Sequence, residues 1–258
     1  RKLTPRVREN GRILLEAYHA IADAVRNQRA ITPAAEWLLD NFHIIEEQIR
    51  DIRDHLPSGF YKELPKIAEG PLHGYPRVYG IAWAFVAHTD SRFDPDLLKR
   101  FVQAYQREQP LTIGELWALP VTLRMVMVEN LRRLAVRIVG SQYARLDADQ
   151  LADELLGLGG KPGASFESLL NARDKDPLAT AFVVQLAQRL RYQDPNVNEG
   201  LKWLDTKLAG QGVSAEELVV MEHHNQAAAN VTVRNIITSM RLMSAFDWQQ
   251  FFEDVSIV

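Results

Sequence analysis

Apolar residues recur every three or four positions along most of this chain, which is the spacing of one face of an α-helix. The clearest run lies between Thr32 and Pro65, and its apolar members are Trp37, Leu38, Ile44, Ile45, Ile49 and Ile52. Thr32 followed by Pro33 is typical of a helix N-terminus, because threonine caps free backbone N–H groups and proline lacks one. The run predicts one amphipathic helix, buried on one face, that ends at the Leu56-Pro57-Ser58-Gly59 segment.

Other helix starts carry equally local signals. A capping residue stands directly before proline at Thr4-Pro5, Asp94-Pro95, Asp176-Pro177 and Asp194-Pro195. A capping box, in which Ser or Thr is followed three residues later by Glu, occurs at Thr112 with Glu115 and at Ser214 with Glu217. No strand-turn-strand pattern is visible. The sequence therefore predicts an all-α protein, a multi-helix bundle of about ten helices.

Three features refine this bundle. Residues 77–88 are apolar nearly all round, so that helix should be central. Pro120 should kink or split the helix that begins at Thr112, because proline cannot donate a backbone hydrogen bond. Aromatic rings can stack on sugars, but those at helical spacing are more often core residues, and we expect them in the core here. They are Tyr79, Trp83, Phe85, Trp117 and Trp248.

The segment Leu158–Gly163, with the sequence LGGKPG, is the best hinge in the chain. It could separate two helical subdomains, an N-terminal bundle over residues 5–157 and a C-terminal helical segment over residues 164–258. Helical spacing continues to Val258, and the chain starts with Arg1 rather than Met. We therefore expect the last helix to be truncated and the chain to be a fragment of a longer protein.

Composition excludes several classes of function. The 258 residues carry a net charge of −3, which argues against a general nucleic-acid binder. The chain has no cysteine, so disulfides, thiolate catalysis and cysteine-ligated metals are excluded. No signal peptide is visible, and the longest uncharged stretch, Val78 to Thr89, is too short to span a bilayer.

For each candidate catalytic or metal-binding pattern, a structural interpretation is the better one. Asp147-Ala148-Asp149 has the DxD pattern of many glycosyltransferases, but no strand precedes it, and Gln150 makes it a capping box. Two carboxylate-x-x-His pairs and one Glu-His-His run should be solvated because they lie off the apolar stripes or lack a partner. They are Glu16/His19, Asp40/His43 and Glu222-His223-His224. We predict no catalytic, cofactor-binding or metal-binding residues.

The connection Leu56–Pro76 is the better candidate for a contact surface. It holds four prolines and three glycines after Leu56, and it is far longer than most connections in helical bundles. Phe60, Tyr61 and Tyr75 lie in this irregular stretch. Aromatic residues are common at interface hot spots, so we predict a docking surface there. The alternative is that these rings pack back onto the bundle and close its end.

Four stretches resemble the N-terminal region of cyclic β-1,2-glucan synthases. They are AAEWLLDNFHIIEEQIRDIRDHLPSGFYKELP from Ala34, YPRVYGIAWAFVAHTDSRFD from Tyr75, QPLTIGELWALPVTLRMVMVENLRRLA from Gln109 and TVRNIITSMRLMSAFDWQQFFEDVS from Thr232. The resemblance implies a bacterial parent enzyme that polymerises glucose from UDP-glucose and closes the chain into a ring. It also implies that this region precedes a membrane-embedded transferase module, on the cytoplasmic side of the inner membrane.

None of these four stretches is a catalytic motif, and no QxxRW motif is present. The resemblance therefore favours a non-catalytic scaffold or regulatory domain, without a cofactor, that packs on the transferase module of the same chain. The alternative is a carbohydrate-binding or hydrolytic helical domain that acts on its own. The alternative would be favoured if two carboxylates from different helices were buried together in an aromatic-lined pocket.

Overall fold

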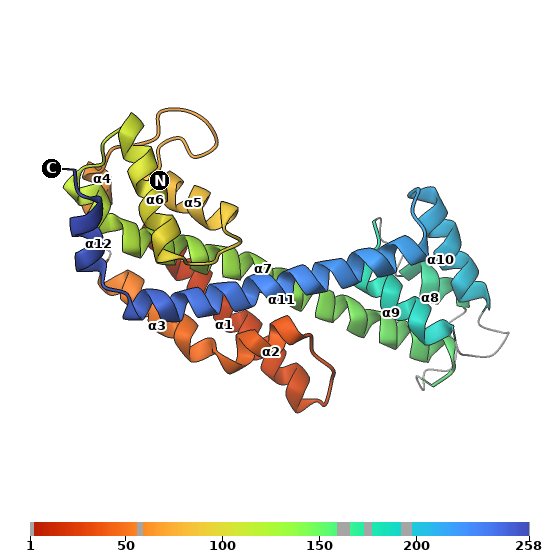
Figure 1. Ribbon diagram of the computed structural model, residues 1–258. Coiled ribbons are helices and arrows are strands. Elements are labelled where there is room, and N and C mark those ends of the chain that lie inside the picture. The colour runs from red at the N-terminus through yellow and green to blue at the C-terminus, as the bar shows by residue number, and fades with distance from the viewer. Residues whose placement is uncertain (1–2, 56–58, 159–165, 173–176, 192–197, 258) are drawn as a thin grey trace. The chain divides into compact units, whose positions relative to one another are not determined.

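The computed structural model describes residues 3–55, 59–158, 166–172, 177–191 and 198–257 (Figure 1). These residues form twelve α-helices and no β-strand, which confirms the all-α prediction. The helices are α1 (Leu3–Arg26), α2 (Pro33–Asp40), α3 (Phe42–Asp54), α4 (Phe60–Glu63), α5 (Arg77–His88), α6 (Pro95–Glu108), α7 (Ile113–Leu155), α8 (Phe166–Ala172), α9 (Thr180–Leu190), α10 (Asn198–Gly210), α11 (Ala215–Ala245) and α12 (Trp248–Val255).

Most predicted helix starts are confirmed by the hydrogen bonds of their caps. The Ala35 backbone N–H donates to the Thr32 hydroxyl, and the Leu97 N–H donates to the Asp94 carboxylate. Both predicted capping boxes are formed, with Glu115 and Glu217 each accepting from the residue three positions earlier. These signals were readable because each cap involves groups within one turn of the chain.

Other helix boundaries differ from the predicted ones. The single helix predicted after Thr32 is divided at Asn41 into α2 and α3. The Asn41 side-chain amide donates to the Trp37 carbonyl, and its oxygen accepts from Arg241 of α11 at 2.5 Å. Asparagine competes for backbone hydrogen bonds, and a partner from a distant helix stabilises the break.

Of the two outcomes predicted for Pro120, a kink or a split, the split does not occur: α7 continues through Pro120, which is buried in its second turn. The helix start predicted at Pro177 was wrong. The helix α9 begins at Thr180 and not at Pro177. The start predicted at Asp194 lies outside the described residues. The helix α12 ends at Val255, whereas the spacing predicted helix up to Val258.

The chain consists of two compact units. One contains Arg1–Val136 and Ala229–Val258, and the other contains Arg137–Ala228. We call them unit 1 and unit 2. The boundary predicted at residues 158–163 falls largely outside the described residues and stays a prediction.

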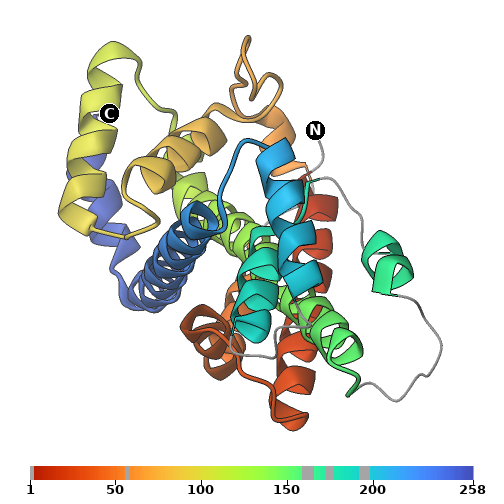
Figure 2. The same cartoon turned by 90° about the vertical axis from the view of Figure 1, so that its right-hand side faces the viewer.

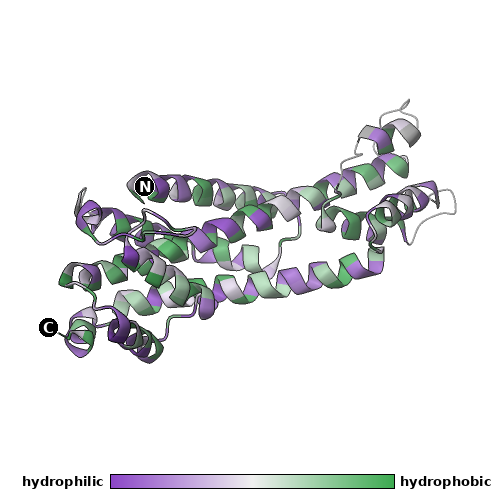
Figure 3. Cartoon of the chain, turned by 90° about the horizontal axis from the view of Figure 1, so that it is seen from above, coloured by the Kyte–Doolittle hydropathy of each residue, from purple (hydrophilic) through white to green (hydrophobic). Residues whose placement is uncertain are grey.

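Unit 1 has a core formed by one face of each helix, and polar and apolar residues alternate along α1 accordingly (Figure 3). Its largest fully buried side chains are Leu14, Ile21, Leu38, Ile45, Ile52, Phe85, Leu98, Leu119, Leu123, Met127 and Leu131. The helix α5 is buried along most of its length, but Trp83 is 43% exposed, contrary to the prediction. The helix α12 packs against α6 (Figure 1).

Unit 2 has a separate core around α9 and α10, which lie side by side (Figure 2). Its buried members are Ala148, Leu151, Ala152, Leu170, Leu178, Phe182, Val183, Leu186, Ala187, Leu190, Leu204, Leu208 and Leu218. Asp149 of the DxD pattern lies inside α7, so the predicted capping box at Asp147 is wrong. The Asp149 carboxylate accepts hydrogen bonds from Gln185 and Arg189 of α9. It therefore holds α9 against α7.

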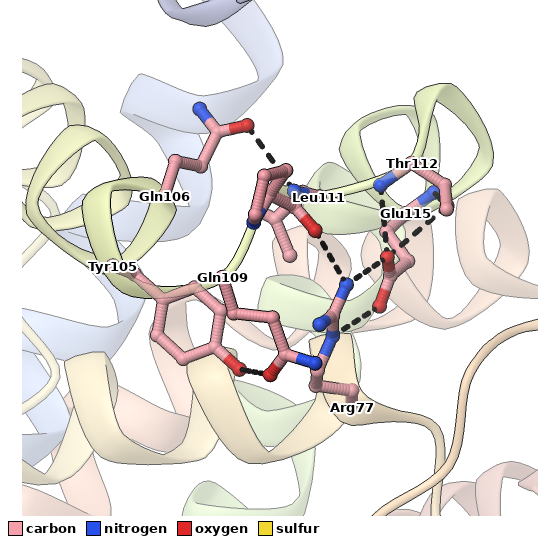
Figure 4. Close-up of polar contacts among 8 residues, drawn as sticks. Arg77, Tyr105, Gln106, Gln109, Leu111, Thr112 and Glu115 are labelled. Atoms are coloured by element: carbon pink, nitrogen blue, oxygen red, sulfur yellow. Dashed lines mark hydrogen bonds and ion pairs between the residues drawn. The ribbon is translucent and has the colours of Figure 1, made fainter.

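The first turn of α7 is fixed by a fully buried carboxylate (Figure 4). Glu115 accepts two hydrogen bonds from the Arg77 guanidinium, at 2.8 and 2.6 Å. It also accepts from the backbone N–H and the hydroxyl of Thr112. The hydrogen bond to Glu115 is the main reason that the pKa of Arg77 is raised. Bidentate pairing of this kind compensates for the loss of water around both charges.

Gln106 connects the same region to the end of α12. Its side-chain N–H donates to the Val255 carbonyl at 2.7 Å, and its oxygen accepts from the Leu111 N–H. Arg77 also donates to the Pro110 carbonyl. Gln106 of α6 thus joins the end of α12 to the connection between α6 and α7.

We predict that Glu115→Ala lowers the free energy of unfolding by about 3–5 kcal/mol, because it leaves the Arg77 charge without its partner in a buried site. Glu217→Ala is the matched control, since Glu217 forms the same capping box in an exposed position. It should cost only about 0.5–1.5 kcal/mol. Urea unfolding followed by far-UV circular dichroism measures both, and equal losses would contradict the role given to the buried pair.

Candidate functional site

Unit 1 contains a pocket of about 440 Å³ between α3, α4, α7 and α12. Four of its lining residues are aromatic: Tyr61, Trp117, Trp248 and Phe252. Three others are charged or polar: Asp51, His55 and Arg124. We call this the aromatic pocket. Its volume lies within the range of about 300–1,000 Å³ that is usual for small-molecule sites.

Trp117 forms the most accessible part of the aromatic wall. Its side chain is 67% exposed, although helical spacing predicted that it would be in the core. The prediction was wrong because the neighbouring positions Leu116 and Leu119 already fill the buried face of α7. The Trp117 ring lies nearly parallel to that of Phe252, with an angle of 8° between them and 6.4 Å between their centroids.

Trp248 is held rigidly behind this wall. Its indole N–H donates to the Met243 carbonyl at 3.0 Å. Its ring contacts Phe246 at 4.9 Å and Phe251 at 5.6 Å, both in edge-to-face geometry. These contacts fix the orientation of the ring before any ligand is bound.

Arg124 follows Trp117 by about two turns on the same face of α7, and it also lines the pocket. Its Nε donates to the Gln48 side chain at 3.0 Å, and its Nη2 donates to the Met243 carbonyl at 3.1 Å. Burial lowers the pKa of Arg124 below the usual arginine value, and the negative charge of Asp51 opposes this shift. Gln48 is fully buried and donates in turn to Ser244. The guanidinium is therefore positioned by α3 and α11.

Tyr61 is the member of the predicted docking surface that lines the aromatic pocket. Its hydroxyl lies 3.2 Å from the Thr122 hydroxyl, which itself donates to the Ala118 carbonyl. The Tyr61 hydroxyl is therefore the donor. Burial raises the pKa of Tyr61 above the ordinary tyrosine value, and the Thr122 contact opposes this shift.

Tyr75 lies elsewhere and packs against the bundle. Its side chain is only 4% exposed, its hydroxyl accepts from Arg6 at 2.5 Å, and its ring stacks on Tyr79. This is the packing that the sequence left open as the alternative, so Tyr75 is not available for docking in this structure. Phe60 begins α4, but its side chain lies outside the described residues.

The connection that carries these residues is ordered between Leu64 and Pro76. The Ile67 N–H donates to the Tyr75 carbonyl, and the Gly74 N–H donates to the Ile67 carbonyl. The Arg77 N–H donates to the Pro65 carbonyl. Gly74 has a φ of 79°, a left-handed conformation that glycine adopts without strain.

The other sequence candidates do not form a site. Glu16, His19, Asp40 and His43 are exposed. Glu222 is buried and accepts from Arg145 at 2.6 Å, a pairing that the sequence did not indicate because the two residues lie far apart along the chain. Among the described residues, no group of three or more His, Asp or Glu side chains is arranged to hold a metal ion.

The aromatic pocket supplies aromatic faces and hydrogen-bonding groups, but little catalytic chemistry. Asp51 is the one carboxylate among the described residues that line it. Glycoside hydrolysis usually requires two carboxyl groups, one as the acid and the other as the base or nucleophile.

The comparisons with known proteins give one informative match. A search of protein-family models found none that fits this chain. The cyclic beta-(1,2)-glucan synthase NdvB of Rhizobium meliloti (strain 1021) is 38% identical to this chain over 252 residues. The match covers 97% of the chain but only 9% of that protein. It confirms the resemblance to the cyclic β-1,2-glucan synthases. Within the described part of the chain, no helix has both the length and the apolar character needed to cross a bilayer.

The different burial of two aromatic residues leads to a prediction. Tyr75→Ala should lower the free energy of unfolding by about 3–5 kcal/mol, since it removes a core ring. Trp117→Ala should change it by less than about 1 kcal/mol, because the side chain is mostly in water. Chemical denaturation of the two variants measures the difference. A loss above 2 kcal/mol, on the order of a core substitution, for Trp117→Ala would mean that this ring serves stability.

Proposed function

We propose that this chain is a helical scaffold or regulatory segment of a cyclic β-(1,2)-glucan synthase, because it is homologous to part of such an enzyme. The observation that carries the proposal is the match over 97% of the chain to 9% of a protein with that name. The whole enzyme polymerises glucose from UDP-glucose and closes the product into a ring. This segment packs on its transferase module, at the cytoplasmic side of the bacterial inner membrane.

The chemistry of the described residues supports a non-catalytic role. Transfer of glucose from a nucleotide sugar requires groups that bind a diphosphate. The DxD pattern lies within α7, and Asp149 is already paired with Arg189. The one carboxylate of the aromatic pocket leaves hydrolysis without a second catalytic group.

Two exposed apolar side chains on one face of α11 are suited to packing against another part of the enzyme. Val231 is 52% exposed and Leu242 is 49% exposed. They are eleven residues apart, which is close to three helical turns, so they lie on the same face of the helix. More than nine-tenths of the relative's length lies outside the matched segment, and it can supply the opposing surface.

The double substitution Val231→Asp/Leu242→Asp tests this interface. We expect it to lower glucan synthesis by a full-length synthase that contains this chain, because a carboxylate is costly to bury in an apolar contact. Ala104→Asp, at an exposed position of α6, is the matched control and should leave synthesis unchanged. Unaltered synthesis by the double variant, at equal protein level, would argue against packing through α11.

The non-catalytic role has its own test. The purified chain should neither transfer glucose from UDP-glucose nor release glucose from β-1,2-glucan, as measured with radiolabelled donor and by product chromatography. Turnover above background that a point substitution in this chain abolishes would refute the proposal.

A further inference from the structure

We propose that the aromatic pocket is a binding subsite for a β-linked glucan chain, one that holds the glucan without cleaving it. This inference names a ligand for the scaffold of the proposed function and rests on it for the choice of sugar.

The aromatic side chains of the pocket suit the faces of a β-linked sugar ring. In a β-linked glucose unit all non-hydrogen substituents of the ring are equatorial and the axial positions carry hydrogen, so both faces of the ring present C–H groups. Such faces stack on aromatic rings, whose faces carry negative charge density. Trp117 and Phe252 both line the pocket and stack on each other within 8° of parallel, so it is the exposed part of the Trp117 ring that a sugar unit can cover.

The polar side chains of the pocket match the hydroxyl groups of a sugar. The hydroxyls at the edge of a sugar ring both donate and accept hydrogen bonds, so their site needs an acceptor and a donor. Asp51 supplies carboxylate oxygens and Arg124 supplies N–H groups, and both line the pocket. Arg124 is held in place by Gln48 and the Met243 carbonyl. The site therefore presents fixed polar groups beside fixed rings.

The charge of the pocket selects among ligands. Among the described residues that line the pocket, Arg124 contributes one positive charge and Asp51 one negative charge, and these two balance. A diphosphate carries at least two negative charges and would need an excess of positive charge or a metal ion. A neutral sugar needs neither. This balance favours a glucan over UDP-glucose.

The pocket is also rigid. Trp248 is fixed by its hydrogen bond to the Met243 carbonyl and by two edge-to-face contacts. A site that is already ordered loses little conformational entropy when a ligand binds. Trp117 is meanwhile accessible enough to be covered by a sugar ring.

The experiment titrates the purified chain with linear β-1,2-gluco-oligosaccharides and follows tryptophan fluorescence and the heat of binding. We expect saturable binding that Trp117→Ala weakens by about tenfold or more, because stacking contacts are lost. Trp83→Ala is the matched control, since it removes an exposed tryptophan of α5 that does not line the pocket. Asp51→Asn should weaken binding while leaving the fold intact, as far-UV circular dichroism will report.

The competing ligands are tested in the same assay. UDP and UDP-glucose should bind much more weakly than the oligosaccharide. Tighter binding of UDP, or oligosaccharide binding that is equal in the wild type and in Trp117→Ala, would overturn the proposal. No saturable binding of the oligosaccharide would overturn it as well.

This outcome is separable from the scaffold role. Glucan binding is measured on the purified chain, whereas packing through α11 is measured as synthesis by the full-length enzyme. Loss of synthesis in Val231→Asp/Leu242→Asp together with no glucan binding would reject the subsite and leave the scaffold. Glucan binding together with unaltered synthesis in that double variant would reject the scaffold.

Discussion

The buried carboxylate of Glu115 is the interaction on which unit 1 depends most. An isolated charge in such a place would cost several kcal/mol, on the order of the stability of a whole domain. Its four hydrogen bonds, from Arg77 and Thr112, compensate for that cost only if α5 and α7 both begin where they do. Because Trp117 follows two residues later on α7, the same pair determines which way the wall of the aromatic pocket faces.

The rest of the pocket is built from segments far apart in the sequence. Arg77 and Gln106 hold the connection before α7, and Gln106 also binds the last residue of α12. Lys99 of α6 pairs with Asp254 of α12 and helps to lower the pKa of that carboxyl. The parallel placement of Trp117 and Phe252 thus follows from polar contacts on α5 and α6, which line no part of the pocket themselves.

The sequence predicted what depends on neighbours within one helical turn. The caps at Thr32, Asp94, Thr112 and Ser214 involve such neighbours, and the helix class follows from them. The break at Asn41 depends on Arg241, and the burial of Tyr75 depends on Arg6, so no local pattern could reveal them. The aromatic pocket was missed for the same reason: helical spacing separates buried from exposed rings only where the buried face of the helix is already known.

The aromatic residues of unit 1 divide into two groups, and the division bears on function. Phe93, Phe246, Trp248 and Phe251 contact one another and support the fold. Trp117 shares the wall with Phe252 but leaves most of its surface in water, where a large apolar ring gains nothing for stability. The Trp117 ring contributes little to folding, and its contact with Phe252 sets its orientation. It is therefore available for contact with a ligand. Physical separation of these two groups allows the bundle to keep its core while Trp117 stays accessible at the pocket.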